Sequence, residues 1–156
     1  MRTGFRLRIA ALGILAWAAL ATAVLAQPTT YRVLKDIRLL EGNDCTYFQI
    51  EFNFPVQYIN HFPPSAGDEL RIQINPIVVN PQDRSALLAR EALSPPESGD
   101  LGLLTIIYDG DLASGPVLTL QFRRPLSYSV GQGHDFRSVL VGIPGPDRTT
   151  PCLPLR

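Results

Sequence analysis

A pattern of seven residues that occurs twice in the chain constrains its fold more than any other feature. The two copies span residues 52–58 and 122–128, and both read Phe-x-x-Pro-aliphatic-x-Tyr. Apolar residues occupy every second position in the run that leads into each copy, which is the pattern of a strand with one buried face. Because proline cannot donate to a sheet ladder, we expect Pro55 and Pro125 to end these strands or to place them at a sheet edge.

The sequences on both sides of the two copies are also similar. Each copy is preceded by an apolar run and a turn rich in Gly, Asn or Asp, and is followed by a loop and another apolar run. The repeated units are the halves of about 31–76 and 101–145. Two units are too few for a solenoid, which needs three or more stacked repeats. We therefore predict an all-β, two-sheet sandwich with a pseudo-two-fold internal repeat. Strands that resemble each other only by composition are the alternative.

The segment between the halves, residues 77–100, has a different composition. Residues 83–93 contain good helix formers and begin with an aspartate that could cap a helix. Residues 94–100 are rich in Pro, Ser and Gly, as in a flexible connection. We predict one short helix in a linker, with its leucines packed against the sheets.

The first 26 residues have the features of a secretory signal peptide. Arg2, Arg6 and Arg8 precede an apolar stretch that ends in small residues, with cleavage expected after Ala26. An uncleaved anchor is the alternative, because the apolar stretch is near the minimum length that spans a bilayer. We expect a mature chain of residues 27–156 that does not span a membrane, in the periplasm of a Gram-negative bacterium.

The charge of the mature chain argues against one class of partner. The whole sequence has 14 basic and 14 acidic residues, and removal of the three arginines of the signal peptide leaves a net charge of about −3. Proteins that bind nucleic acids or anionic membranes usually carry a basic excess. We therefore expect no nucleic-acid partner.

Cys45 and Cys152 are the two cysteines of the chain. An even pair of cysteines in an oxidising compartment favours a disulfide. This bond would attach the proline-rich C-terminal tail to the turn before the first motif, and closing so long a loop would add on the order of 4 kcal/mol of stability. Two free thiols or a metal pair are the alternatives, although two cysteines without a nearby histidine pair form a poor zinc site.

No arrangement of residues in the sequence predicts catalysis. His61 and His134 follow the two motifs, but neither lies in a spacing typical of a metal site. The acidic residues near the turns fit turn chemistry better than a calcium loop, and no serine or cysteine has the local sequence of a nucleophile. We expect no metal, no cofactor and no enzymatic activity, and a small hydrolase is the least favoured alternative.

Aromatic and basic side chains on or beside the repeated units are the best candidates for binding. Such residues anchor protein interfaces, stack on glycans and bind carboxylates. Their other possible role is structural, with the tyrosines covering the ends of the sandwich and the arginines in solvent. The candidate binding residues are Tyr58, His61, Arg71, Arg123, Arg124 and Tyr128.

Arg124 is the most informative of these candidates. Its counterpart in the first motif is Phe54, which continues an apolar face, so the second copy breaks its own inward pattern. A charge is costly to bury without a partner. Arg124 should therefore either pair with a carboxylate such as Glu51 or Asp135, or reach solvent at the end of the sheet.

The mature chain resembles the AMIN domain, a periplasmic β module of cell-wall amidases, secretins and other envelope proteins. The resemblance rests on residues 48–58 and 63–74 and on the repetition of the pattern in 118–128. It implies a fold of two symmetrical sheets and a role in localising a protein or binding peptidoglycan. The first half also resembles the N-terminal modules of periplasmic tetratricopeptide-repeat proteins.

These features predict a non-catalytic module of the cell envelope that binds peptidoglycan or an envelope protein. The alternative is a structural or assembly partner whose sheet edge accepts a strand from another protein.

Overall fold

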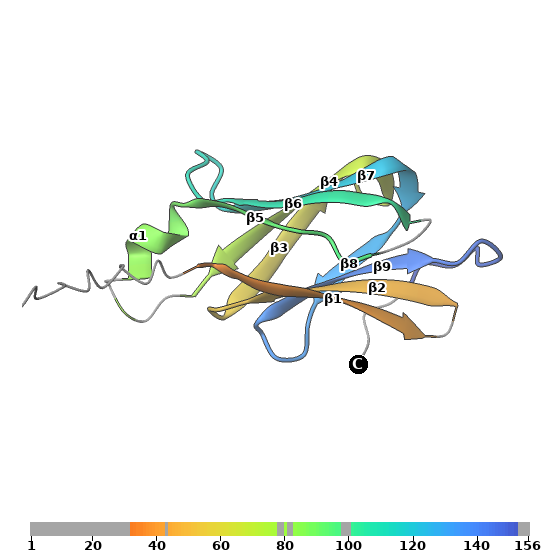
Figure 1. The fold of residues 1–156 in the computed structure, drawn as a ribbon, viewed down its shortest axis with the longest axis horizontal. Coiled ribbons are helices and arrows are strands. Elements are labelled where there is room, and N and C mark those ends of the chain that lie inside the picture. The colour runs from red at the N-terminus through yellow and green to blue at the C-terminus, as the bar shows by residue number, and fades with distance from the viewer. Residues whose placement is uncertain (1–31, 43, 78–79, 81–82, 98–100, 153–156) are drawn as a thin grey trace, which may run out of the picture.

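Two antiparallel β-sheets pack face to face in the computed structural model (Figure 1), which describes residues 32–42, 44–77, 80, 83–97 and 101–152. One sheet has the strand order β1-β2-β9-β8, and the other has the order β3-β4-β7-β6-β5. The predicted signal peptide lies outside the described residues. The elements are β1 (Leu34–Gly42), β2 (Cys45–Phe52), β3 (Val56–Phe62), β4 (Ala66–Pro76), α1 (Arg84–Leu87), β5 (Arg90–Leu93), β6 (Leu103–Asp109), β7 (Val117–Ser127), β8 (Ser129–Gln132) and β9 (Ser138–Pro144).

The two halves of the chain have the same topology. In the first half, the β1–β2 hairpin belongs to one sheet and the β3–β4 hairpin to the other. In the second half, the β6–β7 and β8–β9 hairpins occupy the two sheets in the opposite order. Exchanging each strand for its counterpart turns the order β1-β2-β9-β8 into β6-β7-β4-β3, which is the second sheet without β5. The predicted two-sheet sandwich with a pseudo-two-fold repeat is confirmed.

The phenylalanines that begin the two motifs occupy equivalent positions. Phe52 lies opposite Leu34 in the β1–β2 ladder, and Phe122 lies opposite Leu103 in the β6–β7 ladder. Both ladders shift their register immediately after this leucine. The amide that follows each phenylalanine donates to the carbonyl that precedes each leucine, at 2.9 Å in the first half and 2.8 Å in the second. The two halves therefore share the register shift as well as the regular pairing of their strands.

The hydrophobic core lies between the sheets and contains side chains from both halves. The rings of Phe48 and Phe122, from different sheets, have centroids 6.4 Å apart. Complete burial of an apolar side chain of this kind stabilises a fold by about 1.5–3 kcal/mol. The fully buried core side chains include Phe48, Ile50, Phe52, Leu70, Ile72, Ile74, Ile106, Tyr108, Leu118 and Leu120.

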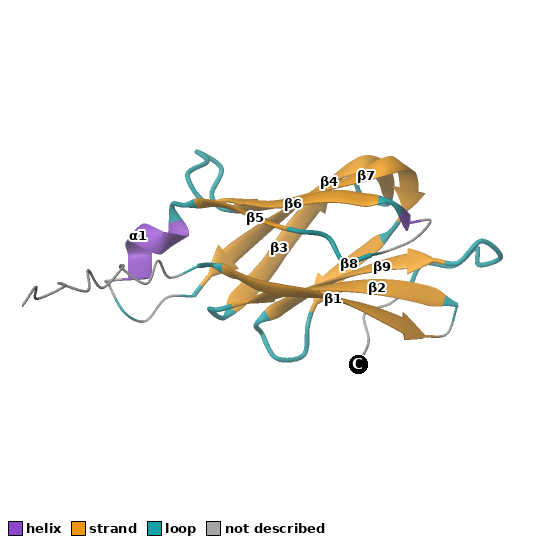
Figure 2. Cartoon of the chain, in the orientation of Figure 1, coloured by secondary structure: helices purple, strands orange, loops and turns teal. Residues whose placement is uncertain are grey.

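The predicted helix over 83–93 is shorter in the structure, and its second part is a strand (Figure 2). Helix α1 has four residues, and β5 pairs with β6 at the edge of the second sheet. The residues of β5 are good helix formers, but the edge of β6 offers backbone hydrogen bonds that outweigh this local preference. Leu87 and Leu93 pack against the core as predicted, whereas Leu88 is exposed.

The motif prolines and the segments after them also differ from the prediction. Strand β2 ends before Pro55, but β7 continues through Pro125. The register between β4 and β7 shifts here, and residues 122–125 have no paired residue in β4. A proline in such a bulge costs no ladder hydrogen bond. The segments predicted as loops after the motifs contain strands: β3 begins within the first motif at Val56, and β8 begins directly after the second.

Side chains join the two sheets along both sides of the sandwich. On one side, the Glu91 carboxylate of β5 accepts hydrogen bonds from the backbone amides of Val33 and Leu34, at 2.7 and 3.0 Å. On the other side, the Gln132 side chain of β8 accepts a hydrogen bond from the Tyr58 amide of β3 at 2.7 Å. These bonds hold the edges of the two sheets together on both sides.

The predicted disulfide between Cys45 and Cys152 is present, with its Cα atoms 6.1 Å apart. It holds the C-terminal tail (residues 145–152) against the outer face of the first sheet, where the two cysteines are buried together with Tyr47. Gly142 permits this close approach, because a Cβ atom at that position would lie 2.7 Å from the Cβ atom of Cys152.

Candidate binding site

The second motif lies at one end of the sandwich, where β7 ends and the loop after β9 begins (Figure 1). Three adjoining pockets open at this end, with volumes of about 650, 400 and 570 Å³. We call them the disulfide pocket, the tyrosine pocket and the arginine pocket, after Cys45, Tyr128 and Arg124 in their linings. Arg148 of the C-terminal tail lines all three.

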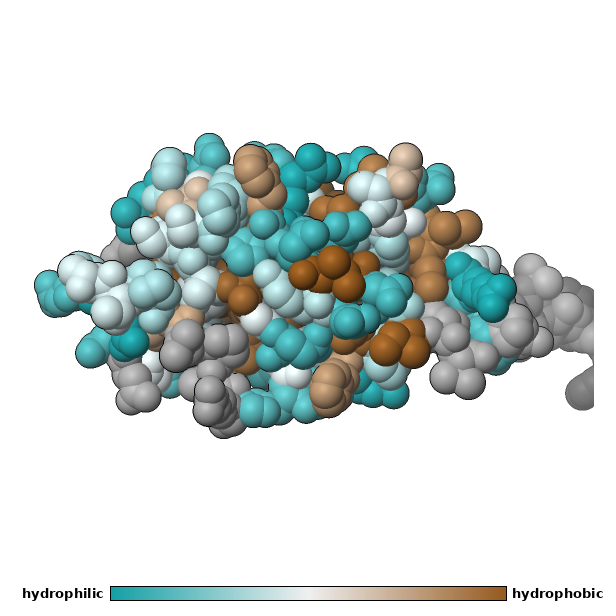
Figure 3. Space-filling model, turned by 180° about the vertical axis from the view of Figure 1, so that it is seen from behind, coloured by the Kyte–Doolittle hydropathy of each residue, from teal (hydrophilic) through white to brown (hydrophobic). Residues whose placement is uncertain are grey.

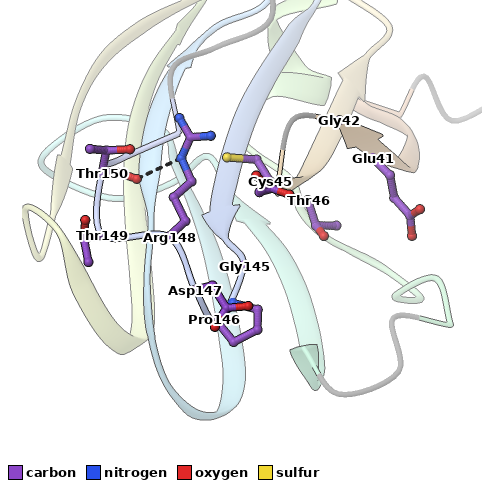
Figure 4. A pocket seen from close by; sticks show the side chains of 11 residues that line it. Glu41, Gly42, Cys45, Thr46, Gly145, Pro146, Asp147, Arg148, Thr149 and Thr150 are labelled. Carbon is purple, nitrogen blue, oxygen red and sulfur yellow. Dashed lines mark hydrogen bonds between the residues drawn. The ribbon is translucent and has the colours of Figure 1, made fainter.

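The C-terminal tail forms one wall of the disulfide pocket. Figure 4 shows the tail residues together with Glu41, Cys45 and Thr46 of the first sheet. The Arg148 side chain turns back on the tail, and its Nε atom donates to the carbonyl of Thr150 at 3.1 Å (Figure 4). This bond fixes the course of the guanidinium group beside the pockets.

The arginine pocket lies where the two sheets open at this end. Two of its 11 lining residues are charged, Arg124 and Arg148. Hydroxyl groups come from Ser127 and Thr46, and no acidic residue lines the pocket. The pocket therefore combines positive charge with apolar walls. Those walls are formed by Leu101, Pro125, Leu126, Ile143, Pro144 and Pro146.

Of the two outcomes expected for Arg124, the structure shows exposure to solvent. The Glu51 carboxylate is paired instead with Lys35 at 3.0 Å and with Arg38 at 3.2 Å. The Asp135 carboxylate accepts hydrogen bonds from the Arg137 amide at 2.9 Å and from the Ser138 hydroxyl at 2.7 Å. Arg124 is exposed and makes no ion pair with another residue that the structure describes.

Tyr58, His61 and Tyr128 form an aromatic cluster beside the tyrosine pocket. His61 Nε2 lies 3.0 Å from the carbonyl oxygen of Pro64, and His61 Nδ1 lies 2.5 Å from the Tyr58 hydroxyl. Because a carbonyl oxygen only accepts, Nε2 carries the proton, and in the neutral ring Nδ1 accepts from Tyr58. The ring centroids of His61 and Tyr128 are 6.3 Å apart. The cluster thus joins the tyrosines that end the two motifs.

Burial makes both tyrosines of this cluster weaker acids. It raises the pKa of the Tyr58 hydroxyl. It also raises the pKa of Tyr128, where the charge of Asp68 adds to the effect. Both hydroxyls are therefore neutral at physiological pH. The Tyr128 hydroxyl donates to the carbonyl of Pro63 at 3.4 Å, so the cluster holds the β3–β4 turn against the second motif.

Arg124 and Tyr128 line pockets, whereas the other four candidate residues, Tyr58, His61, Arg71 and Arg123, line none of the three. Arg71 is on the outer face of the second sheet, where its Nε atom is 3.9 Å from a Glu69 carboxylate oxygen. Arg123 is exposed next to Arg124, but it lines none of the three pockets. The structure therefore brings Tyr58, His61 and Tyr128 into one cluster and places Tyr128 and Arg124 in adjoining pockets, whereas Arg71 lies on the outer face of the sheet.

Sequence reasoning missed Arg148. This residue lies in the proline-rich tail, where no pattern of strand or motif singles it out. The one available signal was the predicted disulfide, which attaches the tail to the first sheet. That signal gives the position of the tail near Cys45 but not the direction of its side chains.

The two copies of the motif have different surroundings. In the first copy, the carbonyl of Asn53 accepts a hydrogen bond from Arg137 Nη1 at 2.6 Å, and the carbonyl of Pro55 accepts one from the Ile77 amide at 2.7 Å. The equivalent residues of the second copy, 123–125, are all exposed. Asn53, the counterpart of Arg123, is exposed as well, whereas Phe54 and Pro55 are partly buried. The two copies therefore differ in exposure at Arg124 and Pro125, which line the arginine pocket.

The exposed apolar side chains do not gather at one place. Figure 3 shows one face of the molecule, on which hydrophobic residues lie in small separate groups among hydrophilic ones. Over the whole described structure, the large exposed apolar residues are spread over several strands and loops. They are Ile59, Phe62, Ile77, Leu88, Leu104 and Phe136. The pockets at the end of the sandwich are therefore a better candidate site than any apolar patch.

The described part of the chain has no group of three His, Cys, Asp or Glu side chains placed to hold a metal ion. Within the same residues, no helix is long and apolar enough to cross a membrane. Comparison with protein-family models, curated proteins and solved structures found no match. The fold and the site thus define the class: a β-sandwich of two equivalent halves with a disulfide-linked tail and a pocketed end.

Proposed function

We propose that this domain is a non-catalytic binding module of the cell envelope that recognises peptidoglycan or an envelope protein through the end carrying the second motif. The difference between the two motif copies carries the proposal. Both copies start from the same backbone arrangement, and Asn53 and Arg123 are both exposed, but only the second copy also exposes its next two residues, Arg124 and Pro125, which line the arginine pocket. The fold does not require the full exposure of positions 124 and 125, because their counterparts Phe54 and Pro55 are partly buried.

The residue types at this end support a binding role. Arginine and tyrosine are enriched among the residues that dominate interface energies. The arginine pocket, at about 570 Å³, is within the size range of ligand sites. The predicted signal peptide and the disulfide support an oxidising, extracytoplasmic location. The resemblance to AMIN domains supports the choice of envelope ligands.

The sheet edges offer less support for strand addition. Strands β5 and β8 have four residues each, and the β3 amides of Val56 and Tyr58 are already bonded to the β8–β9 hairpin. Residues 35–41 of β1 include four charged side chains. Short, covered and charged edges discourage pairing with a foreign strand. We therefore propose the pocketed end, and not an edge, as the binding surface.

Sedimentation and capture experiments on residues 27–156 test this proposal. The purified domain should co-sediment with sacculi, or it should retain an envelope protein from a periplasmic extract. Arg124→Ala should lower the bound fraction several-fold at an unchanged melting temperature, because Arg124 is exposed and the fold does not use its charge.

Arg84→Ala is the matched control for this experiment. It removes the same charge from an exposed position on α1, at the opposite end of the sandwich (Figure 1). Its binding should equal that of the unmodified domain. A domain that binds neither sacculi nor an envelope protein contradicts the proposed function. A lower melting temperature of Arg124→Ala would assign this residue to the fold instead.

A further inference from the structure

We propose that the arginine pocket binds the terminal carboxylate of a peptide whose last residue is apolar, with Arg124 as the main charged contact. This inference rests on the proposed function and names the ligand chemistry of the same end of the molecule. Four features of the pocket carry it: its charge, the state of its arginines, its walls and its connection to the neighbouring pocket.

The charge of the lining separates the arginine pocket from the disulfide pocket. Arg124 and Arg148 are the charged residues of the arginine pocket. Glu41, Asp44 and Asp147 line the disulfide pocket, and Asp68 lies near Tyr128 of the tyrosine pocket. An anionic group is therefore attracted to the arginine pocket and repelled by the acidic side chains next to it.

The two arginines differ in how they are held. The Arg148 side chain is fixed by the bond from its Nε atom to the tail, so it provides a positive charge at a defined place. Arg124 has no carboxylate partner among the described residues, and its charge is not neutralised within the domain. A guanidinium group in this state binds a carboxylate through two parallel hydrogen bonds, a geometry that a hydrated chloride ion or a neutral amide does not match.

The walls of the pocket select an apolar neighbour for the carboxylate. Leu126 and Ile143 are nearly buried, and they belong to β7 and β9, so this part of the pocket is formed by the rigid sheets. Pro125, Pro144 and Pro146 add apolar surface without backbone N–H donors. An apolar side chain next to the carboxylate would bury its surface here at low cost in polar desolvation.

A path for the rest of the peptide leads into the tyrosine pocket. The two pockets share Ser127, Pro144 and Arg148. Tyr128 and residues 149–151 line the continuation. A chain that places its last residue in the arginine pocket can therefore extend between the second motif and the C-terminal tail.

A titration followed by NMR tests the inference on the purified domain of residues 27–156. The probe is N-acetyl-Ala-Ala-Leu with a free carboxylate, and its control is the same peptide with a C-terminal amide. The free acid should shift the amide resonances of the non-proline residues in 124–127 and 143–148, among them Arg124, Leu126 and Ile143. The affinity of the amide should be lower than that of the free acid by a factor of about ten or more, as expected for loss of a charged hydrogen bond.

Variants of the domain assign the effect to the pocket. Arg124→Ala should weaken binding of the free acid about tenfold. The affinity of Arg124→Lys should lie between those of the unmodified domain and Arg124→Ala, because lysine keeps the charge but not the paired geometry. Arg84→Ala should bind like the unmodified domain. Equal binding of the acid and the amide, or full binding by Arg124→Ala, overturns the inference.

Glucuronate, a sugar acid of the same charge, separates the two sources of a carboxylate. Much weaker binding of glucuronate than of the peptide supports the peptide assignment, and equal binding overturns it. Failure of this inference can be distinguished from failure of the proposed function. A domain that binds sacculi or an envelope protein but not the peptide loses only this inference, whereas a domain that binds the peptide but no envelope component loses the proposed function.

Discussion

Glu91 shows how one side chain can join two sheets. Its carboxylate lies on β5, the edge strand that sequence reasoning did not predict, and it accepts the amides of Val33 and Leu34 at the start of β1. Both amides belong to buried residues. Without this acceptor, two backbone donors would lose their partner in a region with little access to water.

Glu91→Ala should therefore lower the free energy of unfolding by about 2–4 kcal/mol, because hydrogen bonds to a charged acceptor are lost and buried donors remain. Glu91→Gln should cost less, since an amide oxygen still accepts. Urea denaturation of the three proteins measures these differences. An alanine variant as stable as the unmodified domain would show that water replaces the carboxylate.

Asp135 makes stability depend on pH at the β8–β9 turn. Partial burial alone would raise the pKa of its carboxyl group, but hydrogen bonds from the Arg137 amide, the Ser138 hydroxyl and its own backbone, with the charge of Arg137, lower it below the ordinary value of 3.8. A group whose pKa is lower in the folded state stabilises the fold above its unfolded pKa. Its contribution is therefore complete above pH 3.8 and is lost as the pH falls through the lower pKa of the folded state.

Asp135→Asn should consequently be less stable than the unmodified domain near neutral pH, and the difference should shrink well below pH 3.8. Melting temperatures of both proteins across this range provide the measurement. A difference that does not change with pH would mean that the carboxylate acts through its shape and not through its charge.

The elements could be predicted from sequence where one face of a strand is buried. Strands β1, β2, β4, β6, β7 and β9 lie in the apolar runs that alternate or are continuously apolar, and the disulfide followed from the even cysteine count. Strand β3 escaped prediction because its register shifts near Ile59 and its exposed positions do not alternate. Strand β5 depends on the edge of β6, a tertiary feature that its own helix-forming residues do not indicate.

The candidate site was predictable in part for similar reasons. Tyr58 and Tyr128 were singled out by the doubled motif, and the pairing of the halves brings them together. The sequence does not predict whether Arg124 is exposed or paired, because it does not show which of the two motif copies is covered by other parts of the chain. The contribution of the tail depends on a single long-range bond, which spans 107 residues.

Removal of that bond tests the role of the tail. The double variant Cys45→Ser, Cys152→Ser should lose about 2–5 kcal/mol of stability, as is typical for a native disulfide that closes a long loop. Because the tail lines all three pockets, the double variant should also bind the envelope ligand more weakly under conditions in which it is still folded. Circular dichroism checks the fold, and co-sedimentation measures the binding. Unchanged binding would remove the tail from the site.

The whole molecule depends on contact between its halves. Each half contributes one hairpin to each sheet, so neither half can cover its apolar faces alone. Single hairpins are marginally stable in water, and packing of the two sheets supplies most of the buried area.

Residues 32–97 and residues 101–152, produced separately, should each fail to form a folded monomer, whereas the complete domain should unfold in one cooperative transition. Far-ultraviolet circular dichroism and size-exclusion chromatography report on both fragments. An equimolar mixture should recover strand content, because the two fragments contain all the described strands. A folded monomer of either half would show that the core is not shared.

The two motif copies differ in how much of their sequence the fold depends on. The Asn53 side chain donates to the carbonyl of Arg32, and Phe54 packs against the core, so a change at either residue should cost stability. Arg124 and Pro125 repeat the backbone positions of Phe54 and Pro55 with their side chains in solvent, so a change at these two positions should cost less stability. A domain built in this way can acquire a new ligand through two exposed positions while its other copy preserves the fold.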